Sequence, residues 1–366
     1  MRRIVALVTV MVVVSMSVVL GGSALLGLGR AADKGVVVVQ VGGGVWADAS
    51  SQAYVGPFEK ETGIKVVAVR DWLSLAKLKL MVESQKVELD VGNMPWSNMI
   101  AATKAGYLER INYSVYNKAE LAQMDDFSKQ THGIGNVYYS WVMGYSTEDF
   151  PPGKPRPTTW AEFWDVKRFP GSRTLRAGNA GSGPYEEALL ADGVPMDKLY
   201  PLDVERAFRS LSRIKPHITT WWKEGAEGQQ LFADKVVVLG QVFHGRILDL
   251  RRKGVPVDIE WNQGKLSLDH WVIPKGAPNP ENAQRFVEFA TRARQQAAFN
   301  EVFPNGPPNR GAFEFIKPET ARTLPTYPEN RKKQLVLNHP WYAETGPGGK
   351  TNIELLIERW NKWILE

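Results

Sequence analysis

The fold is decided by one short stretch, VVVVQVGGG, at residues 36–44. Its run of valines predicts a buried strand, and the three glycines after it predict a tight loop. A helical pattern at 54–61 follows, and a second valine-rich run, IKVVAV, occupies 64–69. This alternation of strand and helix favours an α/β fold with a mostly parallel sheet covered by helices on both faces.

The rest of the chain continues the pattern. A helix is predicted at 73–84 and a short strand at 89–92. Two further apolar segments, at 140–146 and 269–273, are expected to be strands that run between two lobes. A separate strand is predicted at 257–261.

The N-terminus has the layout of a secretory signal. Arg2 and Arg3 precede an uncharged apolar run, and small residues close it at Ala31 and Ala32. We therefore assign residues 1–32 to a signal peptide. Two alternatives stay open: an uncleaved anchor, since the run exceeds about 20 residues, and a twin-arginine signal, which lacks its usual flanking residues.

Composition excludes several classes of function. The chain has 366 residues, enough for two or three domains, and no cysteine, so disulfides, cysteine-ligated metals and a lipidated N-terminal cysteine are excluded. Without Arg2, Arg3 and Arg30 it carries 42 basic against 39 acidic residues, a formal +3, too little for a nucleic-acid binder. A signal without a lipid attachment site favours a Gram-negative periplasm. The 13 tryptophans suggest that some of them line a binding site.

Sequence motifs for catalysis or cofactors are missing. There is no Walker loop, no Gly-x-Ser-x-Gly and no His-Glu-x-x-His, and none of the five histidines pairs with another at metal-ligand spacing. We therefore expect no enzyme activity, no cofactor and no metal. An exported hydrolase remains the alternative, although no pair of catalytic carboxylates suggests itself.

Several stretches, in order along the chain, resemble the extracellular solute-binding proteins of ABC importers, and most of all their spermidine/putrescine-binding group. They are FEKETGIKV at 58–66, PTTWAEFW at 157–164, EGAEGQQL at 224–231, GVPVDIEW at 254–261 and GPPNR at 306–310. The resemblance implies a type II periplasmic-binding-protein fold, with two lobes, each a mostly parallel sheet flanked by helices, and a ligand cleft at the hinge. It places 33–144 and 272–366 in lobe 1 and 145–271 in lobe 2. It also implies a monomer that delivers a small molecule to an inner-membrane ABC permease.

A cleft of this kind needs aromatic walls and a few polar groups. Trp46 follows the first strand at the edge where open α/β sheets bind ligands, and the family places a tryptophan there. Core packing is the alternative for each of these aromatics. The other candidate contacts are Trp96, Tyr138, Tyr139, Ser182, Phe243, His244 and Trp271.

Charged residues give the ligand its expected chemistry. Asp269 falls where polyamine-binding relatives place a carboxylate that holds an amine. Those relatives also place acidic residues just before the helix that begins near Pro184, where this chain has none at 179–183. Arg246 suits a carboxylate or phosphonate. We therefore expect a zwitterion such as 4-aminobutyrate in preference to spermidine; a sugar, an anion or Fe³⁺ remain alternatives.

Overall fold

The two valine-rich runs form a parallel pair, β1 (Val36–Gln40) and β2 (Lys65–Val69), as predicted. The computed structural model describes residues 35–346 and 348–366, so the predicted signal peptide lies outside the described residues. Helical chain connects the two strands: α1 (Gly44–Ser50), a π-helical turn (Ser51–Val55) and α2 (Gly56–Thr62). The loop after β1 is thus shorter than predicted, because the helix already begins at Gly44.

Two long antiparallel strands, β5 (Gly133–Ser146) and β9 (Val257–Val272), form the centre of the larger sheet. Its strand order is β10-β9-β5-β8-β6-β7. The segment expected at 140–146 is the second half of β5. The separate strands expected at 257–261 and 269–273 were wrong as separate elements, because both belong to β9, whose pairing with β5 jumps between Trp141 and Met143.

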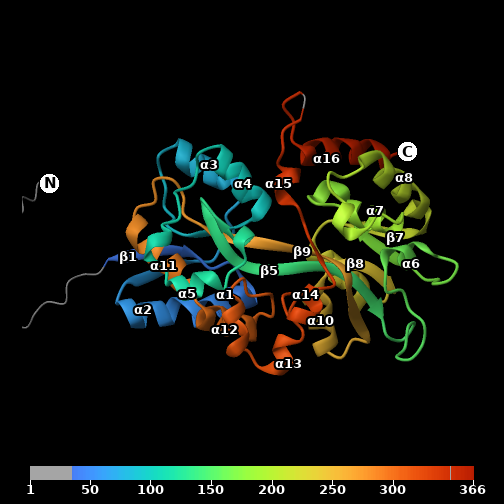
Figure 1. Ribbon diagram of the computed structural model, residues 1–366, viewed down its shortest axis with the longest axis horizontal. Coiled ribbons are helices and arrows are strands. Elements are labelled where there is room, and N and C mark those ends of the chain that lie inside the picture. Colours follow the sequence, from blue (N-terminus) through green and yellow to red (C-terminus); the bar gives the residue numbers. More distant parts are fainter. Residues whose placement is uncertain (1–34, 347) are drawn as a thin grey trace, which may run out of the picture. The chain divides into compact units, whose positions relative to one another are not determined.

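The ends of β5 and β9 reach two different groups of elements (Figure 1). One end lies near β1, β2, α1 and α11 (Pro280–Ala290). The other end continues into the parallel strands β6 (Arg173–Arg176), β7 (Ile218–Trp222) and β8 (Leu239–Phe243). The remaining α-helices and β-strands are β3 (Gly92–Pro95), β4 (Lys129–Gln130), β10 (Leu335–Val336), α3 (Leu75–Glu83), α4 (Trp96–Lys104), α5 (Lys118–Ala122), α6 (Trp160–Trp164), α7 (Tyr185–Ala191), α8 (Val204–Ile214), α9 (Gly225–Ala233), α10 (His244–Arg252), α12 (Ala293–Val302), α13 (Pro318–Ala321), α14 (Pro328–Arg331), α15 (His339–Tyr342) and α16 (Asn352–Trp363).

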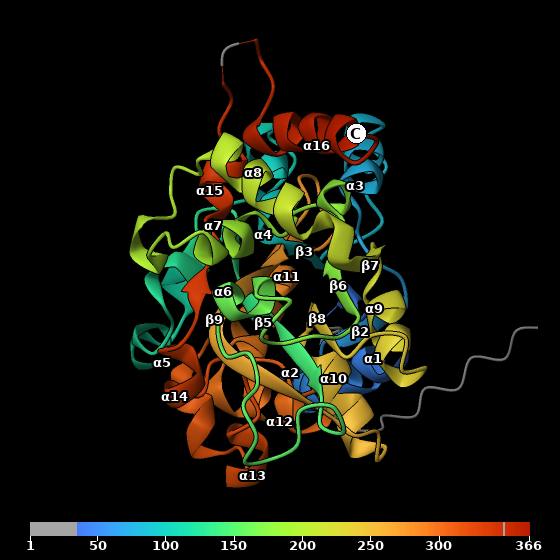
Figure 2. The same cartoon turned by 90° about the vertical axis from the view of Figure 1, so that its right-hand side faces the viewer.

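Each end of the crossing strands contributes to a separate hydrophobic core. Ile134 of β5 and Trp271 of β9 pack with β1, α2 and α11. Trp141 of β5 packs instead with β6, α7, α8 and α16. The C-terminal helix belongs to this second core, since the Trp360 ring lies 5.0 Å from that of Trp221. Figure 2 shows α16 above α7 and α8.

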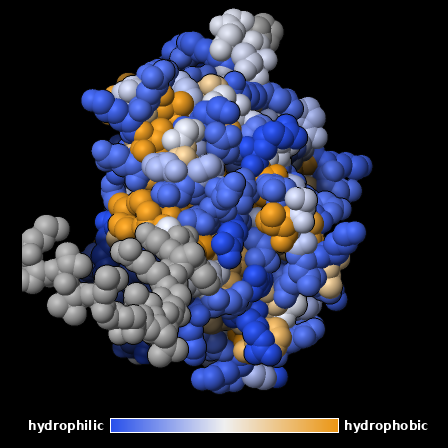
Figure 3. Space-filling view, turned by 90° about the vertical axis from the view of Figure 1, so that its left-hand side faces the viewer, coloured by the Kyte–Doolittle hydropathy of each residue, from blue (hydrophilic) through white to orange (hydrophobic). Residues whose placement is uncertain are grey.

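The face beside β1 is mostly hydrophilic and shows only separate apolar patches (Figure 3). Of the helices in the described residues, none is long and apolar enough to cross a bilayer.

Candidate functional site

The first charged group of the site is Asp269, near the end of β9. Its Oδ2 accepts a hydrogen bond from Asn93 Nδ2 at 3.2 Å, while its Oδ1 is buried without a partner among the described residues. Burial raises the pKa of Asp269 to about 6, although Asn93 and Tyr139 oppose the shift. A carboxylate with one oxygen left unsatisfied is a ready acceptor for an ammonium group.

One aromatic ring, that of Tyr139, lies next to this carboxylate. Tyr139 of β5 lies 5.8 Å from Phe243 and 5.2 Å from Trp141, measured between ring centroids. Burial raises the pKa of the Tyr139 hydroxyl, and the charge of Asp269 adds to the rise. Tyr139, Trp141 and Phe243 thus form an aromatic cluster beside Asp269.

The second charged group is Arg176, the last residue of β6. Its guanidinium carbon lies 5.4 Å from the Trp141 ring centroid and 5.9 Å from that of Phe243. Two of its nitrogens donate to the carbonyls of Ala180 and Ser182, and Nε is buried without a partner among the described residues. Burial lowers the pKa of Arg176, and Tyr139 counters that shift. Arg176 stays charged, because an arginine pKa remains far above neutral pH.

Five predicted site residues are therefore in or beside one region. Asp269, Tyr139 and Phe243 form part of it directly. Ser182 supplies its backbone carbonyl to Arg176. His244 follows Phe243 but is buried, with Nδ1 accepting from the Ser140 amide at 3.3 Å, and burial lowers its pKa to about 4.

The other predicted residues lie outside this cluster, although Arg246 Nε and Phe243 both come within 4 Å of a Cβ placed on Gly225. Trp46 is half-buried against Trp72, Phe299 and Phe303. Trp96 stacks on Phe127, and Tyr138 is buried with its hydroxyl donating to Asp125. Trp271 is enclosed in the hydrophobic core. Arg246 is exposed on α10 and donates to Gln229 of α9.

Sequence reasoning missed Arg176, Trp141 and Asn93. Arg176 ends a strand, and the carboxyl ends of parallel strands are where α/β sheets bind ligands, so this signal was available. Trp141 and Asn93 gave no such signal, because their roles depend on pairing with distant strands.

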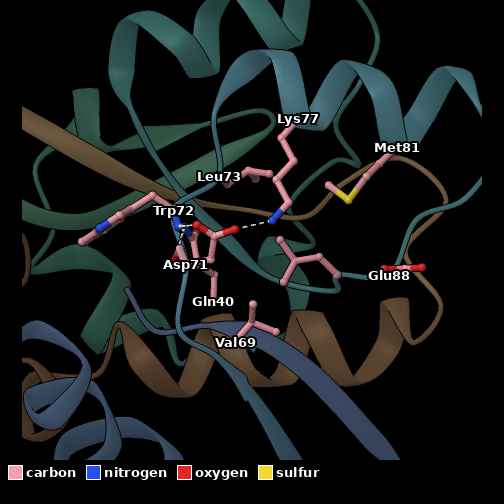
Figure 4. A pocket seen from close by; sticks show the side chains of 9 residues that line it. Gln40, Val69, Asp71, Trp72, Leu73, Lys77, Met81 and Glu88 are labelled. Atoms are coloured by element: carbon pink, nitrogen blue, oxygen red, sulfur yellow. Dashed lines mark hydrogen bonds and ion pairs between the residues drawn. The ribbon is translucent and has the colours of Figure 1, made fainter. Parts of the chain in front are cut away.

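A cavity of about 100 Å³ lies apart from these residues, between α3, β2 and Gln40. Its lining is mostly apolar, and the Asp71 carboxylate at its edge points to Lys77 (Figure 4). Neither Asp269 nor Arg176 lines it. In the part of the chain that the structure describes, no group of three or more histidine, aspartate or glutamate side chains could hold a metal ion.

Comparisons with known proteins place the chain in a family. The model of the bacterial extracellular solute-binding protein family matches residues 53–328. The chain is 32% identical over 347 residues to the gamma-aminobutyric acid-binding protein of Pseudomonas aeruginosa, covering 93% of this chain and 94% of that protein.

Solved structures show the same fold. An ABC transporter substrate-binding protein from Bradyrhizobium japonicum is similar, with 36% identity, a TM-score of 0.81, and coverage of 90% of this chain and 99% of that chain. A GABA receptor is also similar, with 34% identity, a TM-score of 0.78, and coverage of 89% and 97%. The predicted type II periplasmic-binding-protein fold and the expectation of a binding subunit that is not an enzyme are confirmed. The chain therefore belongs to the bacterial extracellular solute-binding protein family and serves as the substrate-binding subunit of an ABC transporter.

Proposed function

We propose that this subunit captures a small zwitterion with an ammonium group at one end and a carboxylate at the other, such as 4-aminobutyrate. One observation carries the proposal: Asp269 and Arg176 flank the same aromatic cluster, and each keeps a buried polar atom without a partner among the described residues. The ammonium binds Asp269 and the carboxylate binds Arg176. The similar protein of Pseudomonas aeruginosa, which binds gamma-aminobutyric acid, supports this choice.

Arg176 takes the role that the sequence suggested for Arg246. The Arg246 side chain is exposed and its Nη1 lies 3.2 Å from Gln229 Oε1, whereas Arg176 contacts Trp141 and Phe243. A guanidinium in a partly desolvated aromatic setting binds a carboxylate more strongly than one in water.

A diamine fits less well, because it needs a second free carboxylate. The two acids nearest the expected position, Glu186 and Glu187, are buried and both bind Lys265 Nζ, at 2.9 and 3.0 Å. All four oxygens of these two carboxylates already accept hydrogen bonds from buried or partly buried side chains, so a second ammonium would be left unpaired. Spermidine and putrescine remain the competing ligands to test.

Isothermal titration of the mature chain, residues 33–366, tests the proposal. Binding of 4-aminobutyrate should be lost in R176L and in D269N and kept within about threefold in R246L, the matched control. Tight binding of spermidine or putrescine that R176L leaves unchanged would overturn the zwitterion.

We further propose that the protein acts in the periplasm as a monomer, and that it docks on an inner-membrane permease. The signal-like N-terminus and the family match support this location. Light scattering of the purified protein should give the mass of a single chain.

Packing of α16 against Trp221 supports assigning the last helix to lobe 2, in place of the lobe 1 boundary predicted from the sequence.

A further inference from the structure

Two buried asparagines and the half-buried Asp269, on three different strands, form a chain of hydrogen bonds. Asn136 of β5 donates from Nδ2 to Asn93 Oδ1 at 2.8 Å. Asn93 of β3 then donates from Nδ2 to Asp269 Oδ2 at 3.2 Å. Asn93 and Asn136 are only 4% and 1% exposed, so water does not replace these contacts.

A β-bulge accounts for the position of Asn136. The pairing of β5 with β9 shifts between Gly135 and Val137, so that Asn136 is the extra residue. Bulges re-aim a side chain, and here the side chain reaches Asn93 on β3. The backbone of Asn93 is fixed as well, because its amide donates to Gln40 Oε1 at 2.8 Å.

The two hydrogen bonds run in one direction, from Asn136 through Asn93 to Asp269. Because Asn136 donates to the carbonyl oxygen of Asn93, the NH₂ group of Asn93 is left to donate to Asp269. An NH₂ group can only donate, and a donor stabilises the charged form of a carboxylate. Asn93 therefore opposes the effect of burial on Asp269 and occupies Oδ2, which leaves Oδ1 for a ligand.

We propose that Asn93 is a positioning residue for ligand binding: oriented by Asn136, it holds Asp269 ionised and directs the free Oδ1 toward the ammonium of the ligand. This inference rests on the proposed function, in which Asp269 binds an ammonium. It assigns a role to a residue that is not part of the aromatic cluster.

Few other groups act on the charge of Asp269. From β5 it faces Tyr139, which stays neutral because burial raises its pKa. From β3 it faces Asn93, which does not titrate. Its neighbour on β9, His270, is also neutral, since burial lowers its pKa to about 3. Arg176 of β6 acts on Tyr139. Asn93 is thus the largest influence opposing the rise that burial causes.

The first experiment needs no ligand. The Asp269 carboxyl is followed by ¹³C NMR from pH 4 to pH 9, with D269N identifying its signal. N93L should raise the pKa of Asp269 by about one unit relative to wild type, because a donor to the charged form is lost. N136L, which leaves Asn93 in place but releases its orientation, should give a smaller rise. N179L, at an exposed asparagine, is the control and should give none.

An unchanged Asp269 pKa in folded N93L would overturn the inference. N136L carries the same test if N93L does not fold, since an unchanged pKa there contradicts the orienting role. Circular dichroism establishes folding for each variant.

The second experiment measures 4-aminobutyrate affinity by titration calorimetry between pH 5 and pH 8. The logarithm of affinity should fall with unit slope as pH drops below the Asp269 pKa, and N93L should move that midpoint upward by about one unit. A merely structural role would lower affinity equally at every pH. Wild-type binding without any such midpoint would overturn the proposed function, whereas a midpoint that N93L leaves in place would overturn only the role of Asn93.

Discussion

Lys265 Nζ lies 2.9 Å from Glu186 Oε2, and neither side chain has any solvent exposure. Lys265 also binds Glu187 at 3.0 Å and the Gly183 carbonyl at 2.8 Å. Burial alone would lower the pKa of Lys265, but the two carboxylates outweigh it and raise the pKa. The contact joins β9 to the start of α7.

This network also supports the proposed site. Gln241 donates from Nε2 to Glu187, and its Oε1 accepts from the Arg176 amide at 3.1 Å. The backbone of Arg176 is therefore connected through Gln241 and Glu187 to Lys265 on the crossing strand.

K265M should destabilise the protein by about 3–5 kcal/mol, because it leaves buried carboxylate charge without its partner. Urea unfolding at pH 7 measures the change. K350M is the matched control: Lys350 pairs with Glu358 at the surface, and its loss should alter the free energy of unfolding by less than about 1 kcal/mol. Equal effects of the two substitutions would contradict the importance of the buried network.

Much of the fold could be predicted because the deciding signals are local. The runs at 36–41 and 64–69 are β-branched and bounded by glycine, and both became strands. The length of β9 was not predictable in this way. Its middle contains polar residues such as Asn262 and Gln263, at the point where the pairing with β5 jumps. The apolar pattern of the sequence is interrupted there although the strand itself continues.

The site was only partly predictable, for a similar reason. Asp269 could be placed from the resemblance. Tyr139 was a candidate because it precedes the strand predicted at 140–146, although it lies in the middle of β5, and Phe243 was one further candidate aromatic. Trp271, two residues from Asp269, has the same sequence signal but packs against Tyr54 and Phe286 in the core. Spacing along a strand does not reveal which aromatic ring faces the interior of a core and which faces a charged group.

D269N should stabilise the ligand-free protein while abolishing amine binding. The folded pKa of Asp269 is about 6 and its ordinary value is 3.8, so the folded state holds the proton more tightly. Protonated Asp269 therefore stabilises the folded state below about pH 4, and this stabilisation is lost as the pH rises through about 6. D269N removes that loss, and at pH 7.5 it should raise the free energy of unfolding by about 3 kcal/mol.

Urea unfolding of wild type and D269N at pH 4.5 and pH 7.5 checks this sign. The gain should be larger at pH 7.5. A D269N protein that is less stable than wild type at pH 7.5 would show that Asp269 contributes to folding and is not held at a cost for binding.

H270L should protect the protein against acid. Both ring nitrogens of His270 are buried without partners among the described residues, and burial, with a smaller effect of His339, lowers its pKa to about 3. In the unfolded chain His270 binds a proton with its ordinary pKa of about 6.5, whereas in the folded chain it stays neutral down to about pH 3. The free energy of unfolding therefore falls as the pH drops below 6.5. At pH 5 this loss is about 2 kcal/mol, and H270L should abolish it.

H339L provides the contrast for this measurement. The pKa of His339 is also about 3, but its Nε2 lies 2.8 Å from Ser267 Oγ. H339L therefore leaves a buried hydroxyl unpaired and should cost about 1–3 kcal/mol at pH 7, where H270L costs little. Urea unfolding at pH 5 and pH 7 gives the free energy of unfolding of both variants at each pH. Similar losses for both variants at pH 7 would contradict the difference in hydrogen bonding.

G42A should displace the Trp72 ring, whereas G43A should have little effect. Gly42 has φ +67°, and a Cβ placed there would lie 2.7 Å from Trp72 and 2.9 Å from Trp46. Both the left-handed backbone and the contact disfavour alanine, so we expect a loss of about 2–3 kcal/mol with a change in tryptophan fluorescence. At Gly43 a Cβ meets nothing within 4 Å and φ is −129°.

Because Trp46 packs edge-on against Trp72, the comparison of G42A with G43A also tests Trp46 as a cleft wall. A change in 4-aminobutyrate affinity in folded G42A, with none in G43A, would support that role. Unchanged affinity in G42A would assign both rings to packing alone.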